Sequence, residues 1–161
     1  MNHSVPLVRR GHERRLIEVP LLGLSIYVLV STTESGGAQC VTEFVIPDGY
    51  EGPAPHWHDV YSETFIGLEG RFSLHIGDVV HQLGPNDVGF VPPRQAHTYS
   101  VPAGAPVRFL LITAPGGDFD GYLAAVAEYV AETGERPLAD HESFRVLQAK
   151  FDTYDASIPV F

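Results

Sequence analysis

The sequence predicts an all-β domain followed by one or two α-helices. Between Leu24 and Ala114, short apolar runs alternate with turn residues. After Gly117, the apolar residues recur at helical spacing instead. Short strands at such regular intervals are typical of an antiparallel sandwich or barrel. The 161 residues suit a single domain with one hydrophobic core.

Eight runs carry the apolar and β-branched residues that favour strands. They are Leu24–Thr33, Gln39–Ile46, Glu63–Leu68, Arg71–Ile76, Val79–Leu83, Val88–Val91, Thr98–Val101 and Val107–Ala114. Turn residues separate them, and Gly77-Asp78 predicts a tight hairpin between two of the runs. We therefore expect a polar N-terminal arm over residues 1–20 and an antiparallel barrel over residues 21–115.

The apolar period changes in the C-terminal segment, residues 116–161. Residues on one expected helix face recur at steps of three and four: Phe119, Tyr122, Leu123, Val126, Tyr129 and Val130. Asp118 is the expected N-cap of this helix, and Gly134 lies near its expected end. A second, weaker helical pattern follows, with Asp140 as its expected cap. We expect this segment to pack on the barrel as part of the same domain.

The charge balance argues against two classes of partner. Ten Lys and Arg residues face 20 Asp and Glu residues, which gives a formal net charge of −10. Such a surface repels phosphate backbones and anionic lipids, so we expect neither nucleic acid nor membrane as a partner. Four arginines near the N-terminus are a local exception, and we interpret them as part of a solvated arm. They are Arg9, Arg10, Arg14 and Arg15.

The single cysteine bears on the compartment. Because Cys40 has no partner in the chain, no internal disulfide can form, which favours a reducing environment. We interpret Cys40 as a buried structural thiol, since no base adjoins it in sequence. The apolar run Leu21–Val30 follows arginines as an export signal would, but Glu18 and Pro20 interrupt the approach, and the run is too short to span a bilayer. We expect a cytoplasmic protein.

Two histidines stand one residue apart in an otherwise strand-like stretch. Residues i and i+2 of a strand share a face, with Cα atoms roughly 6.5–7 Å apart, so His56 and His58 can converge on one ion. Glu63 follows five residues after His58 and would face the opposite side of an unbroken strand. It can join the histidines only if residues 59–62 form a bend or bulge that resets the register.

A third histidine can join them through the fold. His97 follows the turn Pro92-Pro93-Arg94 and opens a predicted strand, which an antiparallel barrel could bring beside the first pair. Three imidazoles and one carboxylate suit Fe²⁺, Mn²⁺, Co²⁺, Ni²⁺ or Zn²⁺, and an octahedral ion would keep two open positions. Open positions distinguish a working metal from a structural one. We expect surface or structural roles for the other histidines, which are His3, His12, His75, His81 and His141.

Two stretches around these residues resemble the two motifs of the cupin superfamily. The stretches are His56-x-His58-x₄-Glu63-x₆-Gly70 and Asp87-x₄-Pro92-x₄-His97. Residues 33–37, 44–49, 65–70 and 111–117 and the C-terminal helices are similar to the single-domain, quercetin 2,3-dioxygenase-like cupins. The resemblance spans roughly residues 20–155. It implies a cupin jelly-roll barrel.

The resemblance also implies a ligand set and a catalytic group. His56, His58, Glu63 and His97 would bind one divalent transition metal per chain: Fe, Ni, Co or Mn, with Cu and Zn also used in the family. Glu63 would be the catalytic acid/base. The chain departs from the motifs at positions that are not ligands, where the family more often has glycine or asparagine. These positions are Tyr50, Asn86, Arg94 and Val101.

Our leading hypothesis is a metal-dependent dioxygenase acting on a flavonol-like or other enol or aromatic small molecule, with O₂ as co-substrate. A bound ion would lower the pKa of a substrate hydroxyl, and Glu63 would take its proton. Two alternatives stay open. One is a metal-dependent isomerase, cyclase or lyase that uses no O₂, with Glu63 or Tyr99 transferring the proton. The other is a non-catalytic cupin that binds a small molecule.

Aromatic residues on or between the motif strands are the expected walls of the substrate pocket. They are Phe44, Tyr61, Phe65, Phe90, Tyr99 and Phe109. Tyr99 shares the face of His97 by the i+2 rule, which makes it the first choice, also as a catalytic residue. Trp57 has the opposite parity to His56 and is expected outside the barrel lumen. We also expect a homodimer, because short edge strands and the apolar junction Leu21–Leu24 invite pairing.

Overall fold

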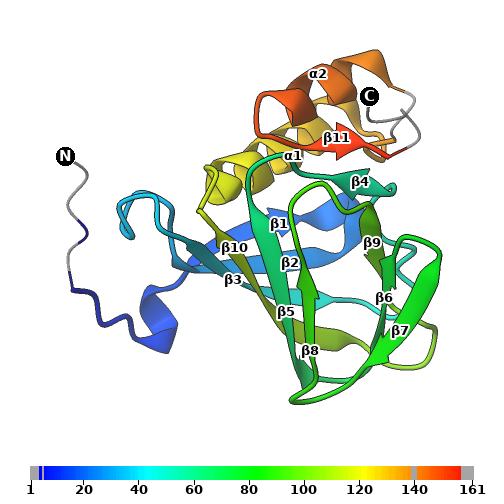
Figure 1. The fold of residues 1–161 in the computed structure, drawn as a ribbon, viewed down its shortest axis with the longest axis horizontal. Helices are drawn as coiled ribbons and strands as arrows, with labels where there is room; N and C mark the ends of the chain where they lie inside the picture. Colours follow the sequence, from blue (N-terminus) through cyan, green and yellow to red (C-terminus); the bar gives the residue numbers. More distant parts are fainter. Residues whose placement is uncertain (1–3, 5, 139–140, 157–161) are drawn as a thin grey trace.

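The computed structural model describes residues 4, 6–138 and 141–156. A β-barrel forms the body of the molecule, and two helices lie together with the last strand at one end of it (Figure 1). The elements are η1 (Gly11–Glu13), β1 (Arg15–Val19), η2 (Pro20–Leu22), β2 (Leu24–Val30), β3 (Cys40–Ile46), β4 (His56–Trp57), β5 (Ser62–Glu69), β6 (Phe72–Ile76), β7 (Val79–Leu83), β8 (Val88–Val91), β9 (His97–Ser100), β10 (Val107–Ala114), α1 (Phe119–Thr133), α2 (Glu142–Ala149) and β11 (Tyr154–Asp155).

The strands form two sheets. One has the order β1-β2-β3-β10-β5-β8, and the other has the order β11-β4-β9-β6-β7. Within the described residues, every strand pairing is antiparallel. The predicted fold class, an antiparallel cupin jelly-roll barrel with C-terminal helices, is therefore confirmed.

An aromatic core fills the space between the sheets. Along β10, Val107, Phe109 and Leu111 are buried while the residues between them are partly exposed, as expected for a strand with one face in the core. The Phe109 ring stacks on Phe72 at a centroid distance of 4.7 Å and on Phe44 at 5.3 Å. Burial with a period of two thus identifies the inward face of this strand, where the sequence itself is apolar on both faces.

The N-terminal segment differs from the prediction. Arg15–Val19 is not part of a solvated arm, because it pairs with β2 as an edge strand. Ile17 and Val19 face the core while Leu16 and Glu18 face outward, an alternation that is too short to stand out in a polar segment. The arginines around it are also tied down by ion pairs, which are Arg9–Glu34, Arg14–Glu43 and Arg15–Asp120.

The two helices close one end of the barrel. On α1, Phe119, Leu123 and Val130 are buried, as the helical period predicted. Asp118 is the N-cap residue, as predicted, although its side chain makes no capping hydrogen bond. Gly134 ends the helix in the left-handed conformation, at φ 66°. The cap predicted at Asp140 lies outside the described residues.

Asp120 joins three parts of the chain. Its Oδ2 accepts a hydrogen bond from the Arg15 guanidinium at 2.5 Å, and its Oδ1 accepts one from the backbone N–H of Thr32 at 3.0 Å. Burial of the carboxyl opposes its ionisation, but the hydrogen bonds from Thr32 and Arg15 outweigh that effect and lower the pKa of Asp120. The ionised carboxylate therefore links α1 to β1 and to the end of β2.

We expect Asp120→Asn to lower the free energy of unfolding by about 1–3 kcal/mol at neutral pH, the usual cost of losing hydrogen bonds to a buried charged group. The folded-state pKa lies below the unfolded value of about 4, so this stabilisation is present above pH 4 and is lost as the pH falls through the folded-state pKa. Urea unfolding at neutral and acid pH measures the difference. Glu128→Gln on the exposed side of α1 is the control, and a deficit that did not shrink in acid would contradict the assignment.

The homodimer stays a prediction. β1 and β8 are the edges of one sheet, and exposed apolar side chains lie on or next to these strands. They are Leu16, Leu21, Val88 and Phe90. We expect light scattering at micromolar concentration to give twice the mass of the chain, and a monomer would contradict this expectation.

Among the described residues, no helix has the length and apolarity needed to cross a membrane.

Candidate metal centre

The four predicted ligands lie together in the barrel. His56, His58, Glu63 and His97 each offer one ligand atom, and these atoms all lie within 4.8 Å of one another. His56 on β4 is the register partner of His97 on β9. His58, Glu63 and His97 are buried, and His56 is partly exposed. The expected convergence of three imidazoles and one carboxylate is therefore present.

A bend brings Glu63 to the histidines. The chain leaves β4 after Trp57, bends at Asp59 and Val60, and enters β5 at Ser62. β4 and β5 belong to different sheets, so Glu63 approaches the histidines from the opposite wall of the barrel. The bend that was expected between His58 and Glu63 is therefore present, and it takes the chain from one sheet to the other.

The orientation of each imidazole is fixed by a backbone carbonyl. The Nδ1 atoms of the three histidines each lie 2.9 Å from a carbonyl oxygen. The pairs are His56 with Ala54, His58 with Asp152, and His97 with Gln95. A carbonyl can only accept, so each Nδ1 carries the hydrogen. In a neutral ring, Nε2 then keeps its lone pair and is ready to bind a metal, the usual arrangement of metal-binding histidines.

The pKa shifts of the cluster describe the charges of its side chains. Burial and the neighbouring His97 and His58 lower the pKa of His56 to about 3, so that ring is neutral. Burial opposes ionisation of Glu63, but interactions with His58 and His97 outweigh it and hold the pKa of Glu63 below its usual range. Burial likewise opposes protonation of His97, and the hydrogen bond to Glu63 outweighs it and raises the pKa of His97. The centre is an ionised carboxylate among imidazoles.

One buried atom shows the fit directly. Nε2 of His97 lies 2.9 Å from Oε2 of Glu63. Nε2 of His58 lies 3.4 Å from Oε1 of Glu63 and, within the described residues, has no hydrogen-bond partner. A buried polar atom without a partner is costly, and a divalent ion among these donors would satisfy it. The residues fit the N₃O donor set that Fe, Mn, Co, Ni and Zn accept.

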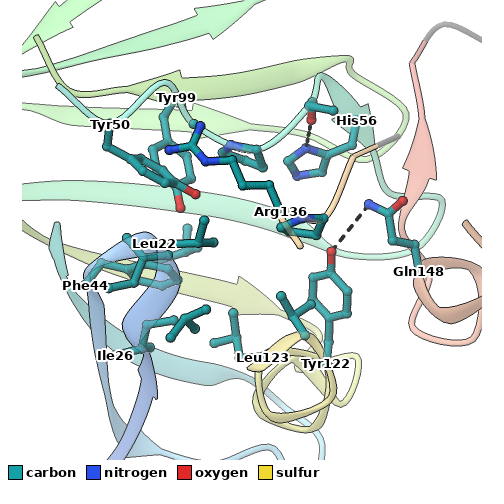
Figure 2. Close-up of a pocket in the computed structure, with 18 of the residues that line it drawn as sticks. Leu22, Ile26, Phe44, Tyr50, His56, Tyr99, Tyr122, Leu123, Arg136 and Gln148 are labelled. Atoms are coloured by element: carbon teal, nitrogen blue, oxygen red, sulfur yellow. Dashed lines mark hydrogen bonds between the residues drawn. The ribbon is translucent and has the colours of Figure 1, made fainter. Parts of the chain in front are cut away.

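A cavity of about 270 Å³ opens beside the cluster. Figure 2 shows its lining: apolar side chains from β2, β3 and α1, with His56 at one side. The polar residues of the lining are Tyr50, Tyr99 and Tyr122, with Glu51, His56, Glu63, Arg136 and Gln148. Burial raises the pKa of Tyr50 and of Tyr122 to about 12 and that of Tyr99 well above its usual value. These hydroxyls stay protonated at neutral pH and can donate hydrogen bonds.

The aromatic residues expected in the pocket divide into three groups. Phe44 and Tyr99 line the cavity. Phe65 and Phe109 are completely buried in the core, and Tyr61 is buried with its ring stacked on His58 at 4.1 Å, so none of these three lines it.

Phe90 differs most from the pocket prediction. Its side chain is 58% exposed, because its register partner is Thr64, and the two residues on either side of Thr64 in β5, Glu63 and Phe65, are the ones that face inward. Trp57 stacks on Tyr154 of β11 and does not line the cavity, as its parity suggested.

The motif departures concern backbone shape. Asn86 and Arg94 both have φ in the left-handed region, at 69° and 65°, where glycine is favoured and asparagine is tolerated. Arg94 is held there by two contacts at 2.6 Å, its N–H to the carbonyl of His58 and its Nε to Asp59. Its side chain therefore lies at the bend and not at the cavity.

Several residues of the site were not identified from the sequence. Asp152 supports His58, and Tyr122, Arg136 and Gln148 line the cavity. All four lie in the C-terminal segment, and only Tyr122 carried a signal, as part of the helical period. Gln148 and Asp152 reach the site through the packing of α2 and β11 on the barrel, and Arg136 reaches it from the segment after α1. Local sequence spacing does not predict these contacts.

Part of the sequence matches a known protein family. A family model of the cupin domain matches residues 42–113. The comparison with curated proteins gave no match.

Solved structures share the fold. An RmlC-like cupin from Shewanella frigidimarina matches with a TM-score of 0.60 and 21% identity, over 72% of this chain and 96% of that one. The polyketide cyclase RemF from Streptomyces resistomycificus matches with 0.57 and 22%, over 69% and 80%. The nucleoside dehydratase Pac13 from Streptomyces matches with 0.53 and 16%, over 70% and 84%. At these identities the likeness shows the fold alone.

Proposed function

We propose that this chain, whose residues 42–113 match the cupin domain, is a metal-dependent enzyme that acts on an enol or phenol-type small molecule. One observation carries the proposal. Three Nε2 atoms and the Glu63 carboxylate converge beside an apolar cavity, with each imidazole fixed by a carbonyl. The donor set leaves open positions on an octahedral ion, which a structural site would not need.

Glu63 is the proposed acid/base. A divalent ion held by His56, His58, Glu63 and His97 would lower the pKa of a substrate hydroxyl and polarise a neighbouring carbonyl. The Glu63 carboxylate lines the cavity and is held ionised, so it can accept the hydroxyl proton. The product of that step is an electron-rich enolate in a largely apolar cavity.

The rest of the cavity orients this substrate. Leu22, Ile26 and Phe44 form an apolar wall for the body of the substrate. Tyr99 and Tyr122 keep their protons and can donate hydrogen bonds to oxygens of the substrate. These hydroxyls would hold the substrate in place and would not act as bases.

The leading reaction is dioxygenation. An enolate of a flavonol-like or related compound would react with O₂, which is reduced while a C–C bond of the substrate is cleaved. The second candidate reaction uses no O₂ and moves a proton in an isomerisation, cyclisation or elimination. Protonated Tyr99 and Tyr122 beside an ionised Glu63 favour it as the alternative, because they pair donors with a base.

Oxygen-electrode assays distinguish the candidates. We expect metal-loaded protein to consume O₂ with quercetin as the probe, and Glu63→Gln to abolish turnover. Glu69→Gln on the same strand, where the carboxylate is exposed, is the matched control and should leave turnover unchanged. Substrate conversion without O₂ uptake would replace dioxygenation by the non-redox reaction. Binding without any conversion would leave a non-catalytic binding protein and contradict the proposal.

A further inference from the structure

One cationic side chain reaches into the cavity. Arg136 follows α1, and among the described lining residues it is the only Lys or Arg. Figure 2 shows its side chain extending across the cavity, with the guanidinium beside the rings of Tyr50 and Tyr99. Its positive charge acts on the Tyr50 hydroxyl. One end of a mainly apolar cavity therefore carries a guanidinium and two hydroxyls, and the carboxylate of Glu51, also a lining residue, lies 3.2 Å from the guanidinium.

The structure does not use this guanidinium for stability. Arg136 forms an ion pair with Glu51 at 3.2 Å, and both side chains are exposed, Arg136 to 51% and Glu51 to 83%. Ion pairs that are this exposed contribute little to folding. By contrast, Arg94 is tied to the bend at Asp59 and does not line the cavity. Arg136 is the cation that remains available to a ligand.

The net charge of the protein bears on what Arg136 can bind. At a net charge of −10, the surface repels small anions, so an anionic substrate needs a local positive group to be retained. A guanidinium offers a planar pair of N–H donors that matches a carboxylate, and such charge-assisted hydrogen bonds are strong. The hydroxyls of Tyr50 and Tyr99 lie at the same end and can donate to the same group.

We propose that the substrate is a small aromatic or enolic acid whose carboxylate binds Arg136. This inference rests on the proposed function for the reacting end only. The carboxylate lies with Arg136, Tyr50 and Tyr99, the apolar body lies against the wall formed by β2, β3 and α1, and the enol or phenol hydroxyl faces Glu63. The cavity thereby selects acids over their neutral analogues.

The test compares matched probes. Calorimetric titration measures the affinities of 4-hydroxycinnamate and of neutral 4-hydroxycinnamamide for the protein. We expect the acid to bind about tenfold or more tightly than the amide, and Arg136→Gln to abolish that preference. Arg71→Gln removes the same charge outside this cavity and should retain the preference. Equal affinities in the wild type, no binding of the acid at millimolar concentration, or equal losses in both variants would overturn the proposal.

A gain-of-affinity variant guards against misfolding as the cause. Glu51→Gln frees Arg136 from its carboxylate partner and should tighten 4-hydroxycinnamate about two- to fivefold; unchanged or weaker binding would count against the proposal. The titrations are made with metal-free and Zn²⁺-loaded protein. If the protein prefers the acid but binds no metal, this inference holds and the proposed function fails. If it binds metal but does not prefer the acid, the proposed function holds and this inference fails.

Discussion

His58→Ala is expected to abolish metal binding. Loaded wild-type protein should hold about one divalent ion per chain, and the variant should hold close to none. His58 is buried, and its Nε2 faces the carboxylate of Glu63 without a hydrogen bond of its own. Removing it deletes one of four donors and leaves two imidazoles and one carboxylate for the ion. Elemental analysis after dialysis measures the ion content.

A matched histidine controls this result. His81→Ala on β7 removes an exposed imidazole outside the cluster and should keep the full ion content. The thermal midpoint gives a second measure, because an ion that binds only the folded state stabilises it in proportion to RT ln(1 + [L]/Kd). Added metal should therefore raise the midpoint of the wild type and of His81→Ala but not of His58→Ala. Equal metal content in both variants would contradict the proposed ligand set.

Asp152→Gly is expected to weaken metal binding by about 10- to 100-fold, the usual effect of losing an outer contact that orients the ligands. The variant loses the carboxylate that holds the bend before Glu63, while it keeps the backbone carbonyl that faces His58. Asp152 lies after α2 and touches no ligand atom of the cluster. Its carbonyl accepts from His58 Nδ1 at 2.9 Å, and its carboxylate accepts the N–H groups of Asp59 at 3.0 Å and Val60 at 2.8 Å. It therefore positions both the imidazole of His58 and the bend that leads to Glu63.

The substitutions at Asp152 are chosen for its backbone. Its φ of 55° is left-handed, so glycine removes the carboxylate without adding strain, and asparagine keeps one of the two acceptor oxygens. We expect Asp152→Asn to fall between Asp152→Gly and the wild type. Chelator competition gives the metal affinities, and Asp78→Asn in the exposed β6–β7 turn serves as the control. If Asp152→Gly bound metal as tightly as the wild type, Asp152 would have no positioning role.

The four metal ligands could be predicted from the sequence because local strand geometry determines where their side chains point. The i, i+2 spacing of His56 and His58 and the turn residues before His97 each follow from strand geometry. The offset of Glu63 required a bend, and the structure supplies it as a change of sheet. Phe65 and Phe109 were expected in the pocket because they lie on or between the motif strands, but they lie in the filled core. Position on a strand defines a side of the sheet and not a depth in the barrel.

The remaining parts of the site depend on contacts between distant segments. Asp152 meets His58 across 94 positions of sequence, and β4 pairs with β11 over only two residues on each strand. Neither hydrophobic periodicity nor a sequence motif predicts such contacts. Arg15–Val19 was missed for a related reason, since two inward residues are too few to outweigh the charges around them. Arg136 acquires its place in the cavity only when the segment after α1 folds back over the barrel.

X-ray absorption at the metal edge of Co²⁺-loaded protein reports the ligands of the bound ion. We expect one ion per chain, bound by three imidazole nitrogens and at least one carboxylate oxygen, with first-sphere distances of about 2.0–2.2 Å. Fewer than three imidazoles in the spectrum, or a spectrum unchanged when His58 is replaced by alanine, would contradict this expectation.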